Sequence, residues 1–427
     1  MKKIIVVITV LLALVFTGCQ KNGTKTSTSK AVEEVVNIRV AYYAVGEAAE
    51  TMQKIVDLFM IKNPNIKIET FQSSWTGHYE KLRAELAAGD APDVYLLDGV
   101  YIPQYAERGV LEDLTQRAAG LDEDNFLGLK QLRTPDNKLY GIPQGIQVDV
   151  LYYNKDMFDE AGLDYPTSDW TLDDLARNAK LLTNDDHWGF AIPLNQIRCG
   201  WYPIIRQFGG DFLDKTRTKS VIKTDKKIKE ALVFMHDAFD KYKYVPNAED
   251  MAGVLTSKAH TYFPREKVAM FYDCYVGVTR NNGAGINYDV VIQPKQNNRY
   301  ASFIANSWVL NKKSDEAEKN AGWKFMEYYL SEEAQNLHIE SANSLPANRA
   351  VMMKLLTDNT TNPENKLAFF ETFGFAGTLA ENAVWAEQNN AFQGHLSKYV
   401  SNEETLDEFI NNTDKEIQSI LDDFYKK

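Results

Sequence analysis

Aromatic and short polar side chains recur together at positions that follow predicted β-strands. Trp75 follows one such strand, Asp98 and Tyr101 follow the next, and Asp273 and Tyr275 follow a later one. An aromatic ring offers a flat apolar surface, while carboxylate and amide oxygens accept hydrogen bonds from hydroxyl groups. A sugar presents an apolar ring face and an equator of hydroxyls, so this pattern favours a carbohydrate-binding site.

The same combination appears at two more places in the chain. Gln144 and Gln147 flank a predicted crossing segment, and Trp308 follows a short run containing Asn306. For any single ring, a position in the hydrophobic core is an equally good interpretation. That alternative stays open for Trp75, Tyr101 and Trp308.

Motifs for catalysis are scarce in this sequence. It contains no His-Glu-x-x-His, Cys-x-x-Cys, Gly-x-Ser-x-Gly or Gly-rich phosphate loop. Two suitably spaced carboxylates suffice for glycoside hydrolysis, and 59 acidic residues leave that possibility open without supporting it. We therefore predict no catalytic residue, no cofactor and no metal site.

The elements that would position these side chains follow an α/β pattern. Alternating apolar residues predict strands at 36–42 and 66–71, and an apolar run predicts a third at 93–97. Helices with apolar residues three and four apart lie between them, near 48–62 and 79–88. Strand–helix alternation predicts a parallel sheet, in which ligands bind beyond the carboxyl ends of the strands.

The later chain continues with further strands and helices. Strands are predicted at residues 148–153, 268–272 and 288–292, and helices near 171–182, 195–208, 226–243, 316–330, 376–393 and 405–425.

The N-terminus has the pattern of a secretory signal. Lys2 and Lys3 precede an apolar stretch, residues 4–16, which is shorter than the ~20 residues of a membrane-spanning helix. Cys19 directly follows Gly18, an arrangement that resembles the bacterial lipoprotein box, although Phe16 stands where Leu, Val or Ile is usual. We predict a signal peptide at 1–18 and a lipidated Cys19. A chance cysteine behind an ordinary signal is the alternative.

Composition limits the function further. Residues 20–30 contain no apolar side chain, so 19–35 should form an anchor and flexible tether. The net charge of -12 argues against nucleic acid as a partner, because phosphate binding needs a basic surface. Cys199 and Cys274 could form a disulfide or remain two buried thiols.

Several segments, taken in order, resemble one family. The chain is similar to the extracellular solute-binding proteins, family 1, which serve ATP-driven sugar importers and include maltose-binding protein. The similar segments are FMIKNPNIKI (59–68), AAGDAPDV (87–94), LYGIP (139–143), LYYNKDMFDEAG (151–162), WKFMEYYLSEEAQ (323–335) and LPANR (345–349).

The resemblance implies a two-lobed α/β fold of the type II periplasmic-binding-protein class, with a ligand cleft between the lobes. By this resemblance lobe I comprises 36–146 and 303–342, and lobe II comprises 149–301 and 345–427. The crossings would fall near residues 147, 302 and 344. Cleft closure would be a hinge motion driven by the ligand.

The family's ligand contacts carry over to particular positions. Loops after the second and third strands correspond to Trp75 and to residues 98–101, and a polar crossing residue corresponds to Gln147. At position 274 this chain has Cys where relatives usually have Gly, which puts backbone access to ligand in doubt there. The remaining positions implied by the resemblance are Trp201 or Tyr202, Asp273, Tyr275, Arg349 and Trp385.

Together these features predict a non-enzymatic, lipid-anchored monomer on the outer face of the cell membrane of a Gram-positive bacterium. It would capture a carbohydrate, more specifically an oligosaccharide, and deliver it to the permease of an ABC importer. Two alternatives remain: a protein that presents its ligand to a membrane sensor kinase, and an anchored glycoside hydrolase.

Overall fold

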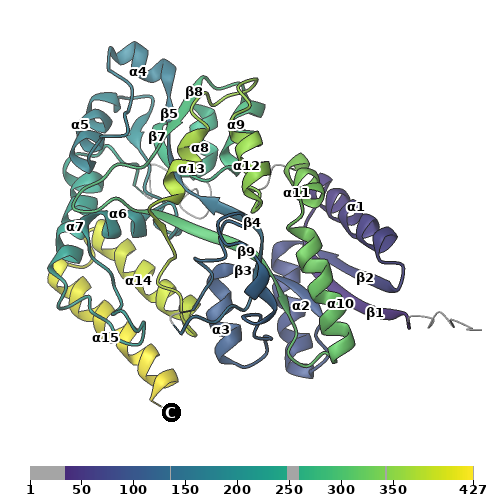
Figure 1. Ribbon diagram of the computed structural model, residues 1–427. Helices are drawn as coiled ribbons and strands as arrows, with labels where there is room; N and C mark the ends of the chain where they lie inside the picture. The colour runs from purple at the N-terminus through teal and green to yellow at the C-terminus, as the bar shows by residue number, and fades with distance from the viewer. Residues whose placement is uncertain (1–33, 135, 248–258, 342–343, 427) are drawn as a thin grey trace, which may run out of the picture. The chain divides into compact units, whose positions relative to one another are not determined.

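The computed structural model describes residues 34–134, 136–247, 259–341 and 344–426 (Figure 1). Residues from Val35 onward form one compact unit. The predicted signal peptide, Cys19 and most of the predicted tether lie outside the described residues. None of the helices in the described part of the chain is long and apolar enough to cross a membrane.

The first sheet contains the predicted β-α-β-α-β unit, which is confirmed. β1 pairs in parallel with both β2 and β3, while β9 runs antiparallel to β3 and β4. The strand order is β10-β9-β3-β1-β2, with β4 on β9. The strands are β1 (Val36–Tyr43), β2 (Ile66–Ser73), β3 (Val94–Asp98), β4 (Ile142–Val148), β9 (Ala301–Leu310) and β10 (Ala376–Gly377).

Helices on this part of the chain follow from amphipathic sequences between the strands. In α1 the buried residues Met52, Ile55 and Phe59 recur three and four apart, which places them on one face. α10 begins with a capping box between Asp315 and Glu318. The helices are α1 (Glu47–Lys62), α2 (Trp75–Ala88), α3 (Ile102–Glu107), α10 (Glu316–Tyr329) and α11 (Glu332–His338).

The second sheet has four strands in the order β6-β7-β5-β8. β5 runs antiparallel to both β7 and β8, and β6 runs parallel to β7. The strands are β5 (Val150–Asn154), β6 (Trp188–Phe190), β7 (Val268–Asp273) and β8 (Tyr288–Val291). The helices between them are α4 (Lys155–Ala161), α5 (Leu172–Leu182), α6 (Trp201–Phe208), α7 (Lys226–His236), α8 (Ala259–Tyr262) and α9 (Val276–Ala284).

Four helices complete the chain: α12 (Arg349–Leu356), α13 (Leu367–Phe373), α14 (Trp385–Val400) and α15 (Leu406–Tyr425). The prediction of a helix at 376–393 was wrong at its start. Residues 376–377 form β10, which pairs with β9, and the helix α14 begins at Trp385. The helix predicted at 195–208 begins later, at Trp201. The helix predicted at 405–425 is confirmed, and Thr405 with Glu408 forms its capping box.

The chain passes between the two sheets at short segments. β4 ends at Val148 and β5 begins at Val150, so Asp149 alone separates a strand of one sheet from a strand of the other. The return occurs between β8 and β9, and Figure 1 shows β9 running across the middle of the described chain. Leu345 exchanges backbone hydrogen bonds of 2.9 Å with Ile146 of β4. The lobe boundaries implied by the resemblance stay a prediction.

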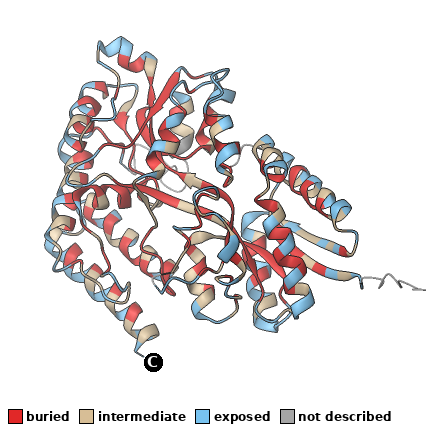
Figure 2. Cartoon of the chain, viewed as in Figure 1, coloured by how far each residue is buried: buried red, intermediate tan, exposed pale blue. Residues whose placement is uncertain are grey.

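Strands β3, β4, β5, β7 and β8 are almost wholly buried, whereas the edge strands β2 and β10 are more exposed (Figure 2). Trp308 on β9 is the clearest case among the candidate residues, since it is 0% exposed. Its ring packs edge-on against Phe325 and Tyr329 of α10, with centroids 5.4 and 5.5 Å away. Trp75, at the start of α2, is 46% exposed.

Truncating these two tryptophans should therefore have different effects on stability. Trp308→Ala should lower the free energy of unfolding by roughly 3–5 kcal/mol, because it leaves a cavity in a packed core. Trp75→Ala, the matched control, should cost about 1 kcal/mol, mainly from one lost hydrogen bond. Urea unfolding followed by circular dichroism measures both values, and equal losses would contradict the difference in burial.

Candidate ligand-binding site

A cavity of about 330 Å³ lies at the carboxyl end of β1 and the start of α2. We call it the Trp75 cavity. Its polar and aromatic lining comprises Tyr43, Thr51, Trp75, Gln144, Gln147, Asn306, Tyr329, His338, Ser341 and Ser344. Three of the residues predicted from sequence, Trp75, Gln144 and Gln147, therefore line one cavity. Among its described lining residues, none is Lys or Arg.

Asp98 lies beside this cavity and connects two of its aromatic residues. Its carboxylate accepts a hydrogen bond from the Tyr43 hydroxyl and another, 3.0 Å long, from Nε1 of Trp75. The backbone N–H of Asp98 donates to the Tyr79 hydroxyl at 2.8 Å. Burial raises the pKa of Asp98, and the hydrogen bonds from Tyr43, Trp75 and Tyr79 oppose that rise.

Aromatic rings surround the Asp98 carboxylate. The Tyr79 ring lies 4.8 Å from the Trp75 ring and 5.0 Å from the Tyr101 ring, centroid to centroid. Tyr43 packs edge-on against His78 at 5.4 Å. Tyr79 is 4% exposed, so it supports the exposed Trp75 ring from the protein side. Such aromatic contacts add to the stabilisation that buried area provides.

Gln144 joins a buried polar network at the edge of the cavity. Its Nε2 donates to the Tyr329 hydroxyl at 3.2 Å and lies 3.4 Å from Nδ1 of His338. Nε2 of His338 lies 2.9 Å from the Ser344 hydroxyl. Burial lowers the pKa of His338 to about 4, because the interior disfavours the charged imidazolium. The imidazole is therefore neutral at pH 7.

Gln147 connects this cavity to the second sheet. Its Oε1 accepts a hydrogen bond from the Cys274 thiol at 3.4 Å, directly after the end of β7. The neighbouring Asp273 is 4% exposed and pairs with Arg280 at 3.0 Å and with Arg198 at 3.5 Å. Asp273 is therefore part of an ion-pair cluster with Arg198 and Arg280, close to the segment that connects the two sheets.

Asp149, at the crossing, belongs to the same cluster. It is fully buried and forms a close ion pair with Arg198. Ligand atoms of Asp149, Asp273 and Cys274 lie within 4.8 Å of one another, a spacing that could suit a metal ion. The Arg198 guanidinium pairs with both carboxylates and so already supplies the positive charge there.

Of the two cysteine alternatives, the structure has the buried free thiols: neither Cys199 nor Cys274 is in a disulfide. Burial raises the pKa of both thiols. Both are therefore inert, protonated side chains at neutral pH.

Several predicted contact residues lie in the core rather than at the cavity. Trp201 is 0% exposed and stacks on Phe392 at 4.2 Å, and Tyr202 is 1% exposed with its hydroxyl directed to Asp211. With Trp308, these rings present no face to a ligand in this structure. For Trp308 this burial fits the core interpretation that the sequence left open.

The remaining candidates are also outside the Trp75 cavity. Tyr275 and Trp385 are 5% and 4% exposed, and the Tyr275 ring packs against Phe369. The Tyr101 ring packs against the Tyr79 ring, with the centroids 5.0 Å apart. Arg349 begins α12, is exposed, and lies over the Phe370 ring at 5.2 Å.

Sequence reasoning missed Tyr43 and His338 as cavity residues. Tyr43 ends β1, one residue beyond the predicted strand, so the rule of reading residues at strand ends would have found it with a correct boundary. His338 ends α11, far from any strand end, and no local pattern marked it. Asn306, noted only as a neighbour of Trp308, lines the cavity itself.

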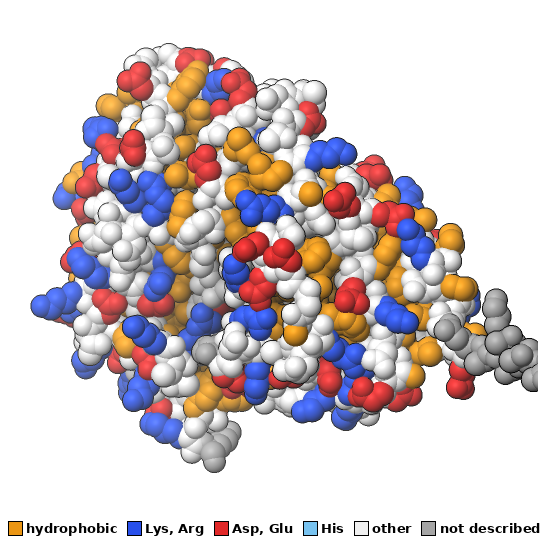
Figure 3. Space-filling model, viewed as in Figure 1, with side chains coloured by type: hydrophobic (Ala, Val, Ile, Leu, Met, Phe, Trp, Pro, Cys, Tyr) orange, Lys and Arg blue, Asp and Glu red, His pale blue; other side chains and the backbone are white. Residues whose placement is uncertain are grey.

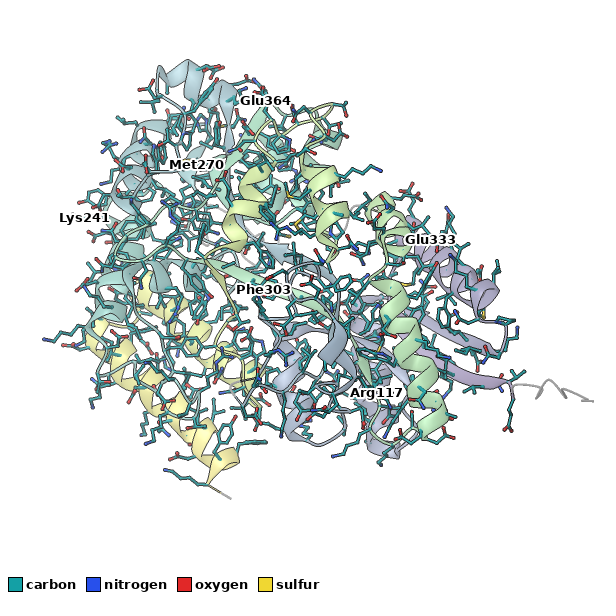
Figure 4. The ribbon with its side chains drawn as sticks, viewed as in Figure 1. Arg117, Lys241, Met270, Phe303, Glu333 and Glu364 are labelled. Carbon is teal, nitrogen blue, oxygen red and sulfur yellow. The ribbon has the colours of Figure 1, made fainter. Side chains whose placement is uncertain are left out.

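A second cavity of about 440 Å³ shares no lining residue with the first. We call it the Tyr140 cavity. Residues on its walls come from α3, from the segment before β4, from β9 and from the later chain near Arg217 and Glu381. Phe303, labelled at the centre of Figure 4, lies on β9 and lines it. The Glu107 carboxylate accepts a hydrogen bond of 3.1 Å from Tyr425.

Charged side chains of both signs are interspersed over the face of the molecule seen in Figure 3. No single-sign area dominates that view, although the whole chain carries a net charge of -12.

Comparisons with known proteins agree on one family for this chain. The model of the bacterial extracellular solute-binding proteins matches residues 44–336. A galactooligosaccharide-binding protein of Bacillus subtilis is 25% identical over 69% of this chain and 68% of its own length. A maltooligosaccharide ABC transporter solute-binding lipoprotein of Streptococcus pneumoniae is 23% identical over 79% of this chain and 78% of its own length.

The alignment with a putative binding protein of Brucella abortus is shorter. The two proteins are 25% identical over 44% of this chain, and the alignment spans about half (46%) of the length of that relative. A solved ABC substrate-binding protein of Listeria monocytogenes, in complex with cycloalternan, has a TM-score of 0.78 and 26% identity. It covers 90% of this chain and 99% of its own. The predicted two-lobed α/β fold is thereby confirmed.

The buried neutral His338 predicts a specific pH dependence of stability. Unfolded His has a pKa near 6.5, so below that value the unfolded chain binds a proton that the folded chain refuses down to about pH 4. Stability should therefore fall as the pH drops from 6.5 toward 4. His338→Gln should reduce the loss between pH 7 and pH 5 by about 2 kcal/mol.

Urea unfolding of both proteins at the two pH values measures this difference. Replacing the partly exposed His187 by Gln is the matched control and should change the pH dependence less. An unchanged pH dependence in His338→Gln would contradict a buried neutral imidazole.

Proposed function

Because the chain belongs to the bacterial extracellular solute-binding proteins, whose family model matches more than half of it, we propose that it is the carbohydrate-binding component of an ABC importer. This family is one of binding proteins rather than enzymes, so we expect capture of the ligand without hydrolysis. The protein would act as a monomer that delivers its ligand to a membrane permease.

The observation that carries this proposal is the exposed Trp75 ring beside a cavity lined with amides and hydroxyls. Trp75 supplies the flat apolar face, and Gln147, Asn306 and Ser344 supply polar groups that can meet sugar hydroxyls. Solute-binding relatives named for galactooligosaccharides and maltooligosaccharides support an oligosaccharide ligand.

The lining favours a neutral saccharide over an acidic one. Its described residues include no Lys or Arg, and His338 is uncharged at pH 7. The guanidinium groups of Arg198 and Arg280, in the cluster beside the crossing, are paired with carboxylates. A uronate or sulfated sugar would find no Lys or Arg among the described lining residues to compensate its charge, and burying an unpaired charge is costly.

Ligand capture would proceed by hinge closure. We assign the crossing near Asp149 as one hinge segment, with Gln147 on the cavity side of it. Closure would bring the second sheet's cluster of Asp273, Cys274 and Arg198 over the ligand held at Trp75. The ligand drives this change only to the extent that it binds the closed form better than the open form.

Isothermal titration calorimetry with a panel of neutral oligosaccharides tests the proposal. The ligand that binds the unaltered protein should bind Trp75→Ala about 5- to 150-fold more weakly, a loss of roughly 1–3 kcal/mol from one stacking ring. Tyr140→Ala, in the second cavity, is the matched control and should leave affinity unchanged.

A loss confined to Tyr140→Ala would place the ligand in the Tyr140 cavity instead. No binding of any glycan by the unaltered protein would contradict the proposed function, and release of reducing sugar would favour the hydrolase alternative.

We also propose that Cys19 carries the lipid that holds the protein at the outer face of the cell membrane. The Streptococcus relative is named a lipoprotein, and two acyl signals suffice for stable anchoring. Cys19→Ala should move the protein from the membrane fraction to the culture medium and abolish metabolic labelling with palmitate. Asn22→Ala, three residues along, is the control and should do neither.

A further inference from the structure

Trp75 is unusual among the described tryptophans named above because it is both exposed and held in one orientation. An exposed side chain at a helix start normally samples several rotamers. Fixing it in one rotamer on binding costs about 1 kcal/mol of conformational entropy. Here the Ser74 hydroxyl caps α2 by accepting from Gly77 N–H, and Nε1 of Trp75 donates to Asp98 at 3.0 Å.

The geometry points to Asp98 as a positioning residue that holds the Trp75 ring for stacking on the ligand, with Tyr43 and Tyr79 fixing Asp98 in turn. This inference rests on the proposed function. It replaces the sequence-based expectation that the Asp98 carboxylate itself receives the sugar hydroxyls.

Both carboxylate oxygens of Asp98 already have protein donors. Oδ1 accepts from the Tyr43 hydroxyl at the end of β1, and Oδ2 accepts from Trp75 at the start of α2. These partners come from two different elements, so the carboxylate is oriented from two sides. Charge-assisted hydrogen bonds of this kind are stronger than neutral ones.

Asp98 is also fixed through its backbone. Its N–H donates to the Tyr79 hydroxyl at 2.8 Å, and it pairs with Asn306 in the antiparallel ladder between β3 and β9. The Tyr79 ring lies 4.8 Å from the Trp75 ring at an interplanar angle of 56°. One side of the indole is therefore supported, and the other side is left for the cavity.

A double-mutant cycle separates positioning from direct contact. Trp75→Phe keeps a stacking ring but removes the Nε1 donor, so Asp98 has nothing left to orient. Asp98→Asn should weaken saccharide binding about 5- to 10-fold in the otherwise unaltered protein, and less than 2-fold in the Trp75→Phe background. Equal losses in both backgrounds would overturn the inference, because a direct contact with the sugar does not depend on the indole donor.

Tyr43→Phe provides a second variant that removes a single hydroxyl and spares the carboxylate. It should weaken binding about 2- to 5-fold, again only while Trp75 is present. A loss of the same size in the Trp75→Phe background would overturn the role assigned to Tyr43. Thermal unfolding of each variant identifies any that fails to fold, and Tyr43→Phe then carries the test.

A ligand-free measurement keeps the inference distinct from the proposed function. With 5-fluorotryptophan at the seven tryptophans, the Trp75 resonance is identified by its loss in Trp75→Phe. In Asp98→Asn this ¹⁹F resonance should move toward the position of a freely solvated indole. An unchanged resonance would overturn the inference, whereas absence of saccharide binding with a shifted resonance would count against the proposed function alone.

Discussion

The pairing of β9 with β3 on one side and β4 on the other fixes where the side chains of the candidate site lie. Asn306 of β9 pairs with Asp98 in one ladder and with Gly145 in the other. One strand therefore brings the end of β3 and the crossing segment together, although they are separated by almost fifty residues of sequence. Gln147 follows on the same strand as Gly145. The positions of Asp98, Asn306 and Gln147 relative to one another depend on this ladder, in which Gln147 pairs with Ile304, two residues before Asn306.

The same strand shows why Trp308 is buried although nearby Asn306 lines the cavity. Trp308 is two residues beyond Asn306 on β9, so both side chains point to the same face of the sheet. At Trp308 that face is covered by Phe325 and Tyr329 of α10, whereas at Asn306 it opens into the cavity. A step of two residues along β9 therefore leads from a cavity-lining position to a core position.

Much of the fold could be predicted because periodicity and burial are local properties of the sequence. The β-α-β-α-β unit and the position of Trp75 after a strand followed from such patterns, whereas Gln147 was placed at a crossing by the resemblance to the family. The bonds from Tyr43 and Trp75 to Asp98 could not be predicted, because they join residues 55 and 23 positions apart and depend on how β1 and α2 pack. Trp201 was misleading for a related reason: α6 is buried on nearly every side, so its aromatic start carries no information about exposure.

The position of Asp149 between the two sheets bears on how they could move relative to each other. It is the single residue between a strand of one sheet and a strand of the other, and its side chain is fixed to Arg198. Under the proposed closure, a rotation between the sheets would change the backbone torsions at this crossing, two residues from Gln147. The Gln147 amide would then lie close to the axis of rotation, where displacements are small compared with those at the distant surfaces. A hydrogen bond gained there would accompany a much larger movement of those surfaces.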